Sequence, residues 1–388
     1  MPEETDIGSS LRKVRKRRGL TQRELAAASG VSLSLIRKLE QREITDTRME
    51  TARKLAVALR VPTASLLTRD RNEEDSVPEQ WQPLRDAVER PPVQSAEAPT
   101  AEGTAALMPS VRAAYFDNRL ADLVPVLAPL LHDLDALDDD QDARALRSHA
   151  LQIAGSVLTQ THQYGAAETA LRRALDSAPD RLRTASIITT WTWLLMRQGR
   201  LEDARRLATH WADELEPRMS RATEEDLAAW GWVLLQLSAA AVRDNRDGEA
   251  RDAMRLARSA AVLTGRELSR GNARLATWGP LTVAYKRAER NVVLDRPDLV
   301  LEAAERLESS GPEESTEHHR HRLDVARAHV MMRQYGEAVE VLGGVRERAP
   351  EWLAQQRYAR DILGDVVERR RTLTPEMRTL ADAVSLPL

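Results

Sequence analysis

The sequence of 388 residues predicts an all-α protein with a small five-helix head, a linker and a larger body of helical repeats. The chain is rich in Ala, Leu and Arg and contains one phenylalanine, a composition that favours helices over strands. Apolar residues recur at helical spacing through the body without strand-like alternation. A short turn followed by a small or aliphatic residue also recurs there, which indicates repeats.

Composition excludes several classes of protein. Hydrophobic residues at 42% can build a core, and the net charge of −3 is small. The absence of cysteine excludes disulfides, thiolate metal sites and cysteine nucleophiles, and it suits the reducing cytoplasm, where we expect the chain. The longest charge-free stretches are too short and too polar for a membrane helix, and the amino terminus lacks the basic and apolar order of a signal peptide.

Charge divides the chain into three parts. Residues 9–69 carry fifteen basic and five acidic side chains, so residues 1–69 form a basic head and the remainder is acidic. Residues 70–104 are acidic and rich in proline, which is typical of a linker. Within it, Trp81, Leu84 and Val88 have helical spacing, so a short helix could dock there. Residues 105–388 form the body, which ends in a capping helix.

The first two helices of the head have clear start and stop signals. Leu11 and Val14 form the apolar stripe of a first helix that is otherwise strongly basic, and Gly19 ends it. Thr21 and Glu24 then form a capping box, in which each side chain satisfies a free amide at the start of the second helix.

The remaining head helices follow after short turns. Gly30 can adopt the left-handed conformation that a tight turn requires, and Ser32 caps the third helix. A second capping box, Thr47 with Glu50, predicts the start of a fourth helix. Pro62 is expected to open the fifth.

Three segments carry a resemblance to a known family: GLTQRELA at 19–26, SGVS at 29–32 and LEQR at 39–42. They resemble the phage Cro-like, xenobiotic-response-element family of helix-turn-helix domains over residues 9–68. The resemblance implies that the third helix enters the major groove of double-stranded DNA and that two heads bind paired half-sites as a dimer.

The family's contacts transfer to individual positions of this sequence. The resemblance implies a phosphate and helix-orienting contact for Gln22, and base-facing positions for Leu33, Ser34, Arg37 and Lys38. Arg37 could bind a guanine edge, whereas the apolar Leu33 departs from the usual polar residue and could meet a thymine methyl group. The full set expected to contact DNA is Gln22, Ser32, Leu33, Ser34, Arg37, Lys38, Arg42, Thr45, Thr47 and Arg48, the last four on phosphates.

The body contains a recurring signal with a variable period. After each turn comes a small or aliphatic residue: Leu123, Ala167, Ala204, Ala250, Val300 and Ala338. These residues are separated by 44, 37, 46, 50 and 38 positions in the sequence. The pattern resembles the tetratricopeptide repeat over residues 105–370, and the long gaps on both sides of Ala250 indicate extended helices or insertions. Stacked repeats bury a continuous core and form a superhelix whose inner wall comes from the first helix of each pair.

The inner wall is the candidate site of the body. The usual inward phase of the repeat places there Gln152, Ser156, Thr189, Trp193, Trp232, Tyr285, Arg320 and Arg327. Aromatic rings combined with guanidinium groups suit a peptide or small-molecule effector. Alternatively, Trp193 and Trp232 are core residues and the two arginines belong to surface ion pairs.

No pattern predicts an enzyme, a metal site or a cofactor. His318, His319 and His321 point in different directions on a helix, so we expect a solvated helix start there. The aspartates at 138–142 lack the glycine and glutamate of a calcium loop. Neither a phosphate-binding loop, nor a dinucleotide fingerprint, nor a nucleophile elbow is found.

The combined architecture resembles Gram-positive peptide-responsive regulators. It implies a cytoplasmic, homodimeric transcription regulator whose repeats bind an effector and change the placement of two heads on DNA. An alternative hypothesis is that the repeats are a protein-interaction or dimerisation scaffold without a small ligand. A third is a role for the same head in RNA binding or conjugation control.

Overall fold

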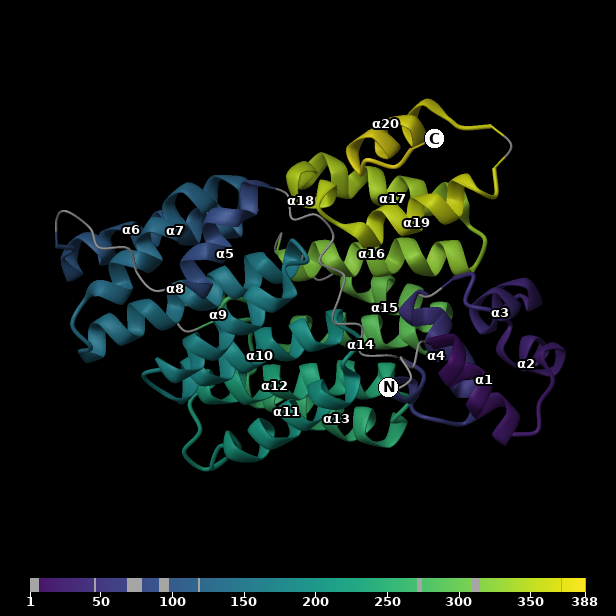
Figure 1. The fold of residues 1–388 in the computed structure, drawn as a ribbon, viewed down its shortest axis with the longest axis horizontal. Coiled ribbons are helices and arrows are strands. Elements are labelled where there is room, and N and C mark those ends of the chain that lie inside the picture. The colour runs from purple at the N-terminus through teal and green to yellow at the C-terminus, as the bar shows by residue number, and fades with distance from the viewer. Residues whose placement is uncertain are drawn as a thin grey trace.

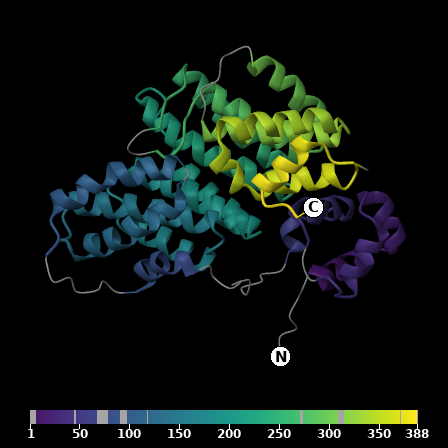
Figure 2. The same ribbon diagram turned by 90° about the horizontal axis from the view of Figure 1, so that it is seen from above.

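The computed structural model describes residues 7–44, 47–67, 79–90, 98–117, 119–270, 274–308, 315–370 and 372–387. The predicted all-α fold is confirmed: the regular elements of these residues are helices, apart from one isolated antiparallel bridge between Leu268 and Trp278. The body forms an arc of helix pairs, and the head lies at one side of it (Figures 1 and 2). Within the described part of the chain, no helix combines the length and hydropathy needed to cross a membrane.

The described residues of the head form four α-helices and one 3-10 turn around a small core. The elements are α1 (Ile7–Arg17), α2 (Gln22–Ser29), α3 (Leu33–Glu40), α4 (Met49–Leu59) and η1 (Thr63–Ser65). One buried cluster joins them, which includes Leu11, Leu25, Ile36, Leu39, Leu55 and Leu66. The predicted fifth helix is therefore a single 3-10 turn, and Leu66 directly after it is buried.

One of the two predicted capping boxes is confirmed and the other is wrong. The Thr21 and Glu24 side chains each bond to the other's backbone amide at the start of α2. At α4, Arg48 and not Thr47 takes the cap position, and the Arg48 side chain forms no capping hydrogen bond. The Glu50 carboxylate instead pairs with Lys54 at 2.8 Å and with Arg327 at 2.7 Å, because two cations compete successfully with a local amide.

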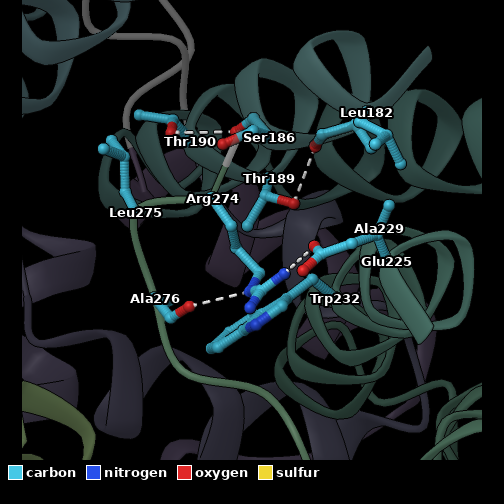
Figure 3. Close-up of a pocket in the computed structure, with 11 residues that line it drawn as sticks. Leu182, Ser186, Thr189, Thr190, Glu225, Ala229, Trp232, Arg274, Leu275 and Ala276 are labelled. Atoms are coloured by element: carbon cyan, nitrogen blue, oxygen red, sulfur yellow. Dashed lines mark hydrogen bonds and ion pairs between the residues drawn. The ribbon is translucent and has the colours of Figure 1, made fainter. Parts of the chain in front are cut away.

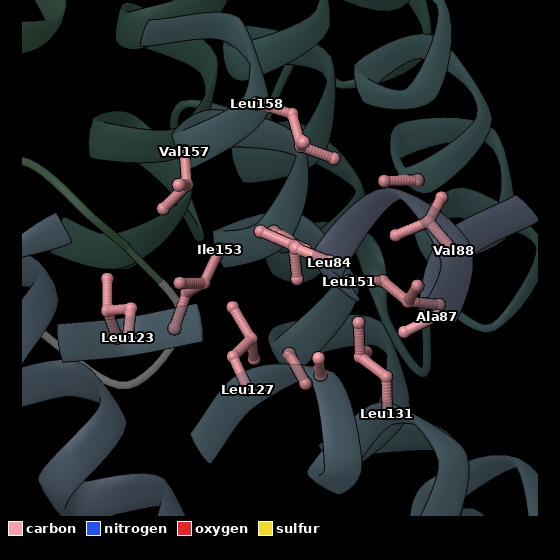
Figure 4. Packing of buried hydrophobic residues seen from close by; sticks show 14 of the residues in the cluster. Leu84, Ala87, Val88, Leu123, Leu127, Leu131, Leu151, Ile153, Val157 and Leu158 are labelled. Carbon is pink, nitrogen blue, oxygen red and sulfur yellow. The ribbon is translucent and has the colours of Figure 1, made fainter. Parts of the chain in front are cut away.

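The short helix within residues 70–104 packs into the body. The turn η2 (Glu79–Trp81) precedes α5 (Gln82–Glu89), and Trp81, Leu84 and Val88 are buried. Figure 4 shows the leucine and valine on α5 against leucines of α7 (Leu120–Ala136) and α8 (Gln141–Gln160). This helix therefore belongs to the first hydrophobic cluster of the body.

The body continues as consecutive helical hairpins. Its other helices are α6 (Ala101–Phe116), α9 (Tyr164–Asp176), α10 (Arg181–Arg197), α11 (Leu201–Glu214), α12 (Glu224–Arg243), α13 (Asp247–Thr264), α14 (Pro280–Val293), α15 (Pro297–Glu308), α16 (Thr316–Met331), α17 (Tyr335–Arg348), α18 (Pro350–Ala354), α19 (Arg357–Val367) and α20 (Pro375–Ala383). The body ends in the closing helix α20, which begins with a Thr374 cap and a proline in the first turn.

The recurring residue has one structural position. It is the fourth residue of the second helix in six hairpins, and it is at most 1% exposed in each: Leu123, Ala167, Ala204, Ala250, Val300 and Ala338. In the last five of these hairpins the residue two before the second helix has a positive φ, namely His162, Gly199, Asn245, Asp295 and Arg333. A left-handed turn residue followed by a buried residue is thus the structural repeat.

The gap of 50 residues between Ala250 and Val300 contains the predicted insertion. Between α13 and α14 the chain leaves the hairpin pattern and places Trp278 in the core with no exposed surface. Its ring lies against Gly231 of α12, where an added Cβ would stand 1.9 Å from a ring carbon. The glycine therefore makes room for the tryptophan.

Candidate nucleic-acid interface and repeat cavity

Helix α3 has one buried face and one exposed face. Ile36 and Leu39 are buried in the head core, and the Ser32 hydroxyl caps the helix by accepting from the Leu35 amide at 3.2 Å. The exposed side chains include Arg37 and Lys38. Ser34 is also exposed, and Leu33 is partly exposed. These four predicted base-facing residues thus lie on the outer face of a fixed helix.

A buried ion pair orients α3. Arg15 of α1 donates two hydrogen bonds to the Glu40 carboxylate, at 2.6 and 2.7 Å, and Gln22 of α2 donates a third at 2.8 Å. Burial raises the pKa of Glu40, but the hydrogen bonds from Arg15 and Gln22 and the nearby positive charge outweigh it, so the pKa lies below its ordinary value. Gln22 therefore connects α2 to the end of α3.

The residues predicted to contact phosphates are spread over the following segment. Arg42 is exposed and has a φ of 62°, and Thr47 is partly exposed. Thr45 lies outside the described residues. The Arg48 guanidinium faces the repeats, 3.4 Å from Asp365 and 3.8 Å from Asp361 of α19. This pairing belongs to the contact between head and repeats, and the role of Arg48 on phosphates stays a prediction.

The head contacts the repeats through α4 and η1. Arg53 donates to the Val242 carbonyl at 3.1 Å. The Ala64 amide donates to Asp244 at 3.0 Å. The ion pair between Glu50 and Arg327 adds a link to α16. In Figure 1, α4 is the head helix next to the repeats, while α2 and α3 lie on the outer side.

Part of the predicted inner wall is filled by its own side chains. Gln152 has no exposed surface, donates to Ser186 at 2.7 Å and accepts from Arg183 at 3.2 Å. Ser156 is 3% exposed and shares a hydrogen bond of 2.7 Å with Tyr115. At this end of the superhelix the polar groups satisfy each other and do not form an open groove.

Two of the predicted wall residues line a small cavity of about 50 Å³ (Figure 3). Thr189 lies on one side, and Trp232 lies on the other with its indole nitrogen 2.8 Å from the Thr277 carbonyl. Arg274 crosses this space to pair with Glu225. Because Trp232 is only 6% exposed, the alternative assignment of this residue to the core is confirmed.

The other predicted wall residues differ in exposure. Trp193 is partly exposed, and the Arg197 guanidinium lies 6.0 Å from its ring centre. Tyr285 is 4% exposed, and its hydroxyl lies 3.1 Å from Nδ1 of His318. Arg320 and Arg327 both line a larger cavity. The eight predicted residues therefore occupy at least three separate environments.

The larger cavity has a volume of about 1210 Å³ and lies between the head and the concave side of the repeats. Head residues of α4 line it, as do the turns after α8 and α10 and one face of α16 and α19. Its size exceeds the ~300–1,000 Å³ of typical small-molecule pockets. A ligand in this space would contact both parts of the chain.

A buried charge cluster at this cavity was missed by the sequence reasoning. The Glu289 carboxylate accepts from Arg243 at 2.6 Å and from Lys286 at 2.9 Å. Burial raises the pKa of Glu289, but these cations and Arg320 hold it well below its usual range. Burial and the charge of Glu289 raise the pKa of the neighbouring Asp324 to about 7. To predict this cluster, one would have to know that Glu289 and Asp324 lie on the faces of their helices that meet at the cavity. The sequence pattern does not show this.

The solvated helix start expected at His318, His319 and His321 is wrong. His318 is 7% exposed and His321 is 3% exposed, because Tyr285 of α14 covers the start of α16. The ring of His321 stacks on Tyr285 with centres 4.7 Å apart. Burial and the nearby cations lower the pKa of His321 to about 4.

A comparison with known protein families supports the assignment of the head. Residues 11–66 match the helix-turn-helix family. None of the curated proteins searched matches the chain. Among solved structures, the crystal structure of Bacillus thuringiensis PlcR in complex with the peptide PapR7 and DNA matches at 14% sequence identity. This match has a TM-score of 0.33 and covers 87% of this chain and 99% of that chain. Residues 11–66 are a helix-turn-helix domain.

Proposed function

We propose that this chain is a dimeric, sequence-specific transcription regulator whose α3 enters the major groove of double-stranded DNA. Arg37 and Lys38 carry the readout together with Ser34 and Leu33, and two heads bind paired half-sites. The observation that supports this most strongly is the outer face of α3. Its basic side chains are exposed, and the helix itself lies on the outer side of the head, so the groove-facing surface is accessible.

The second part of the proposal is that the repeats bind a peptide or small-molecule effector. The cavity of about 1210 Å³ supports it, because one wall is α4 of the DNA-binding head. An effector that prefers one placement of the head over another shifts the population of that placement. The spacing of the two recognition helices, and hence the affinity for paired half-sites, changes with it.

Substitution of Arg37 tests the DNA-binding proposal. The sites that the purified protein prefers are selected from random duplexes, and the affinities of the Arg37→Ala variant for a selected and a random duplex are then compared. We expect a loss of about 1–3 kcal/mol on the selected duplex, with one base preference relaxed. The matched control is Arg255→Ala on the outer helix α13, which removes the same charge. Equal losses on both duplexes, or a preference for RNA over duplex DNA in competition, contradict the proposal.

The hydrogen-bonded wall around Gln152 and Ser156 favours a second candidate function at that end of the body. A wall filled by its own side chains suits a scaffold that docks a partner or a second copy. Native mass spectrometry of the gently purified protein separates the two functions. A dimer with additional mass that is lost on denaturation supports effector binding. A dimer whose additional mass is a second protein, with no small molecule or peptide bound, supports the scaffold.

A further inference from the structure

Three arginines from separate helices face the large cavity. Arg197 is the last residue of α10, Arg320 lies on α16, and Arg357 is the first residue of α19. They are 123 and 37 residues apart in sequence, so the superhelix alone brings them to one space. No single stretch of sequence indicates this group.

These three arginines lack the direct ion pairs that Arg243 and Arg327 form, and Glu289 and Asp324 act on Arg320 only from a longer distance. Among the described residues, no carboxylate lies within 4.0 Å of any of their guanidinium groups, whereas Arg243 pairs with Glu289 and Arg327 pairs with two carboxylates. Arg197 donates to a histidine nitrogen at 3.3 Å and lies over an indole ring, and Arg320 lies 4.7 Å from the ring centre of Tyr358. Aromatic faces hold a guanidinium in place without neutralising it.

The electrostatics of the cavity agree with this arrangement. Eleven arginines and lysines line it against six aspartates and glutamates, although the chain as a whole carries a net charge of −3. Desolvation by the surrounding protein and the like charges of Arg320 and Arg357 outweigh the opposing effect of Tyr164 and lower the pKa of Arg197. Mutual repulsion of this kind is relieved when an anion binds between the cations.

We propose that Arg197, Arg320 and Arg357 form a binding site for an anionic group, carboxylate or phosphate, of the ligand that occupies the cavity. The planar guanidinium fork binds both groups through paired hydrogen bonds. This inference rests on the proposed effector role of the repeats and specifies the chemistry of the effector. The stacked rings fix two of the forks, so little side-chain entropy is lost on binding.

Calorimetric titration of the full chain with two probes tests the site. Citrate represents carboxylates and tripolyphosphate represents phosphates. Both titrations use a chain that carries Arg37→Gln and Lys38→Gln, which reduces binding of polyanions to the DNA-facing surface. We expect one probe or both to bind with one site per chain, and the stronger of the two identifies the preferred group. In the same background, Arg197→Gln with Arg357→Gln lowers that affinity at least tenfold.

Two further variants make the result specific. Arg255→Gln with Arg258→Gln removes the same charge from exposed positions of α13 and changes the affinity less than twofold. Arg197→Lys with Arg357→Lys keeps the charge but removes the forks, so it restores part of the affinity even if the glutamine pair folds poorly. The site is overturned if the α13 pair and the cavity pair lower the probe affinity equally. It is also overturned if neither probe binds with one site per chain.

A DNA-binding measurement on the wild-type chain separates failure of this site from failure of the proposed function. If a probe binds with one site per chain but the affinity for the selected duplex does not change, the anion site is supported and its effector role is contradicted. Normal DNA binding without probe binding overturns the anion site and keeps the regulator.

Discussion

Substitution of Glu40 by glutamine should selectively destabilise the head. The Glu40 side chain is 4% exposed and the Arg15 side chain is 10% exposed, so the ion pair between them is buried. Loss of one partner from a buried ion pair costs about 3–5 kcal/mol, against below about 1 kcal/mol for an exposed pair. Glutamine keeps the shape of the Glu40 side chain and one hydrogen-bond acceptor. We therefore expect a loss of stability at the lower end of this range, near about 3 kcal/mol. At about 1.4 kcal/mol per factor of ten, this is roughly two orders of magnitude in the opening equilibrium.

Native-state hydrogen exchange of the Glu40→Gln variant measures this equilibrium for peptides from residues 7–67. Protection there should fall about a hundredfold, while peptides from the repeats retain theirs. Arg17→Gln on the exposed side of α1 is the matched control and should have little effect. The lowered pKa of Glu40 adds a pH dependence: the ion pair stabilises the head above the unfolded pKa and is lost as pH falls through the folded pKa. A fall in protection below tenfold refutes a buried ion pair.

Two further predictions concern the body. Gly231→Ala should lower stability by about 1–3 kcal/mol, because its Cβ would overlap the buried Trp278 ring, whereas Gly344→Ala within α17 meets no atom within 4 Å and should raise stability by roughly 0.5–1 kcal/mol. Thermal denaturation measures the change in stability of both variants. If both variants are more stable than the wild type, or both are less stable, the packing argument is contradicted. His321 has a pKa of about 4 in the folded state, below its ordinary 6.5, so the unfolded chain binds more protons between these values. Stability should decline from pH 6.5 towards 4, and denaturant titrations of His321→Gln should show a shallower decline. An unchanged slope would mean that this histidine is not buried in its neutral form.

Local signals account for the success of sequence reasoning on the fold. The capping box at Thr21 and Glu24 depends on residues three apart, and the turn glycines Gly19 and Gly30 act on their own backbone. The buried fourth residue of each second helix repeats because every hairpin must pack on the next. These features are determined within a few residues, so the sequence pattern shows them directly.

Long-range contacts explain the failures. Glu50 stands where a capping box requires it, but its carboxylate pairs with Arg327, 277 residues away. One inward phase applied to every hairpin placed Gln152 and Arg320 on the same wall, although the first is fully buried and the second faces the cavity. Gln152 is buried by side chains of α10, whereas Arg320 lines the space between the body and the head, and no local pattern encodes either arrangement.

The left-handed turns of the hairpins have a consequence for how the chain can change. Four of the five described turns use a residue other than glycine at that position, so the backbone keeps its path with different side chains there. Two of them, His162 and Asp295, line the large cavity. Side chains at these turns can therefore be exchanged while the buried fourth residues hold the hairpins in register. New recognition properties can evolve at these turns without redesign of the scaffold.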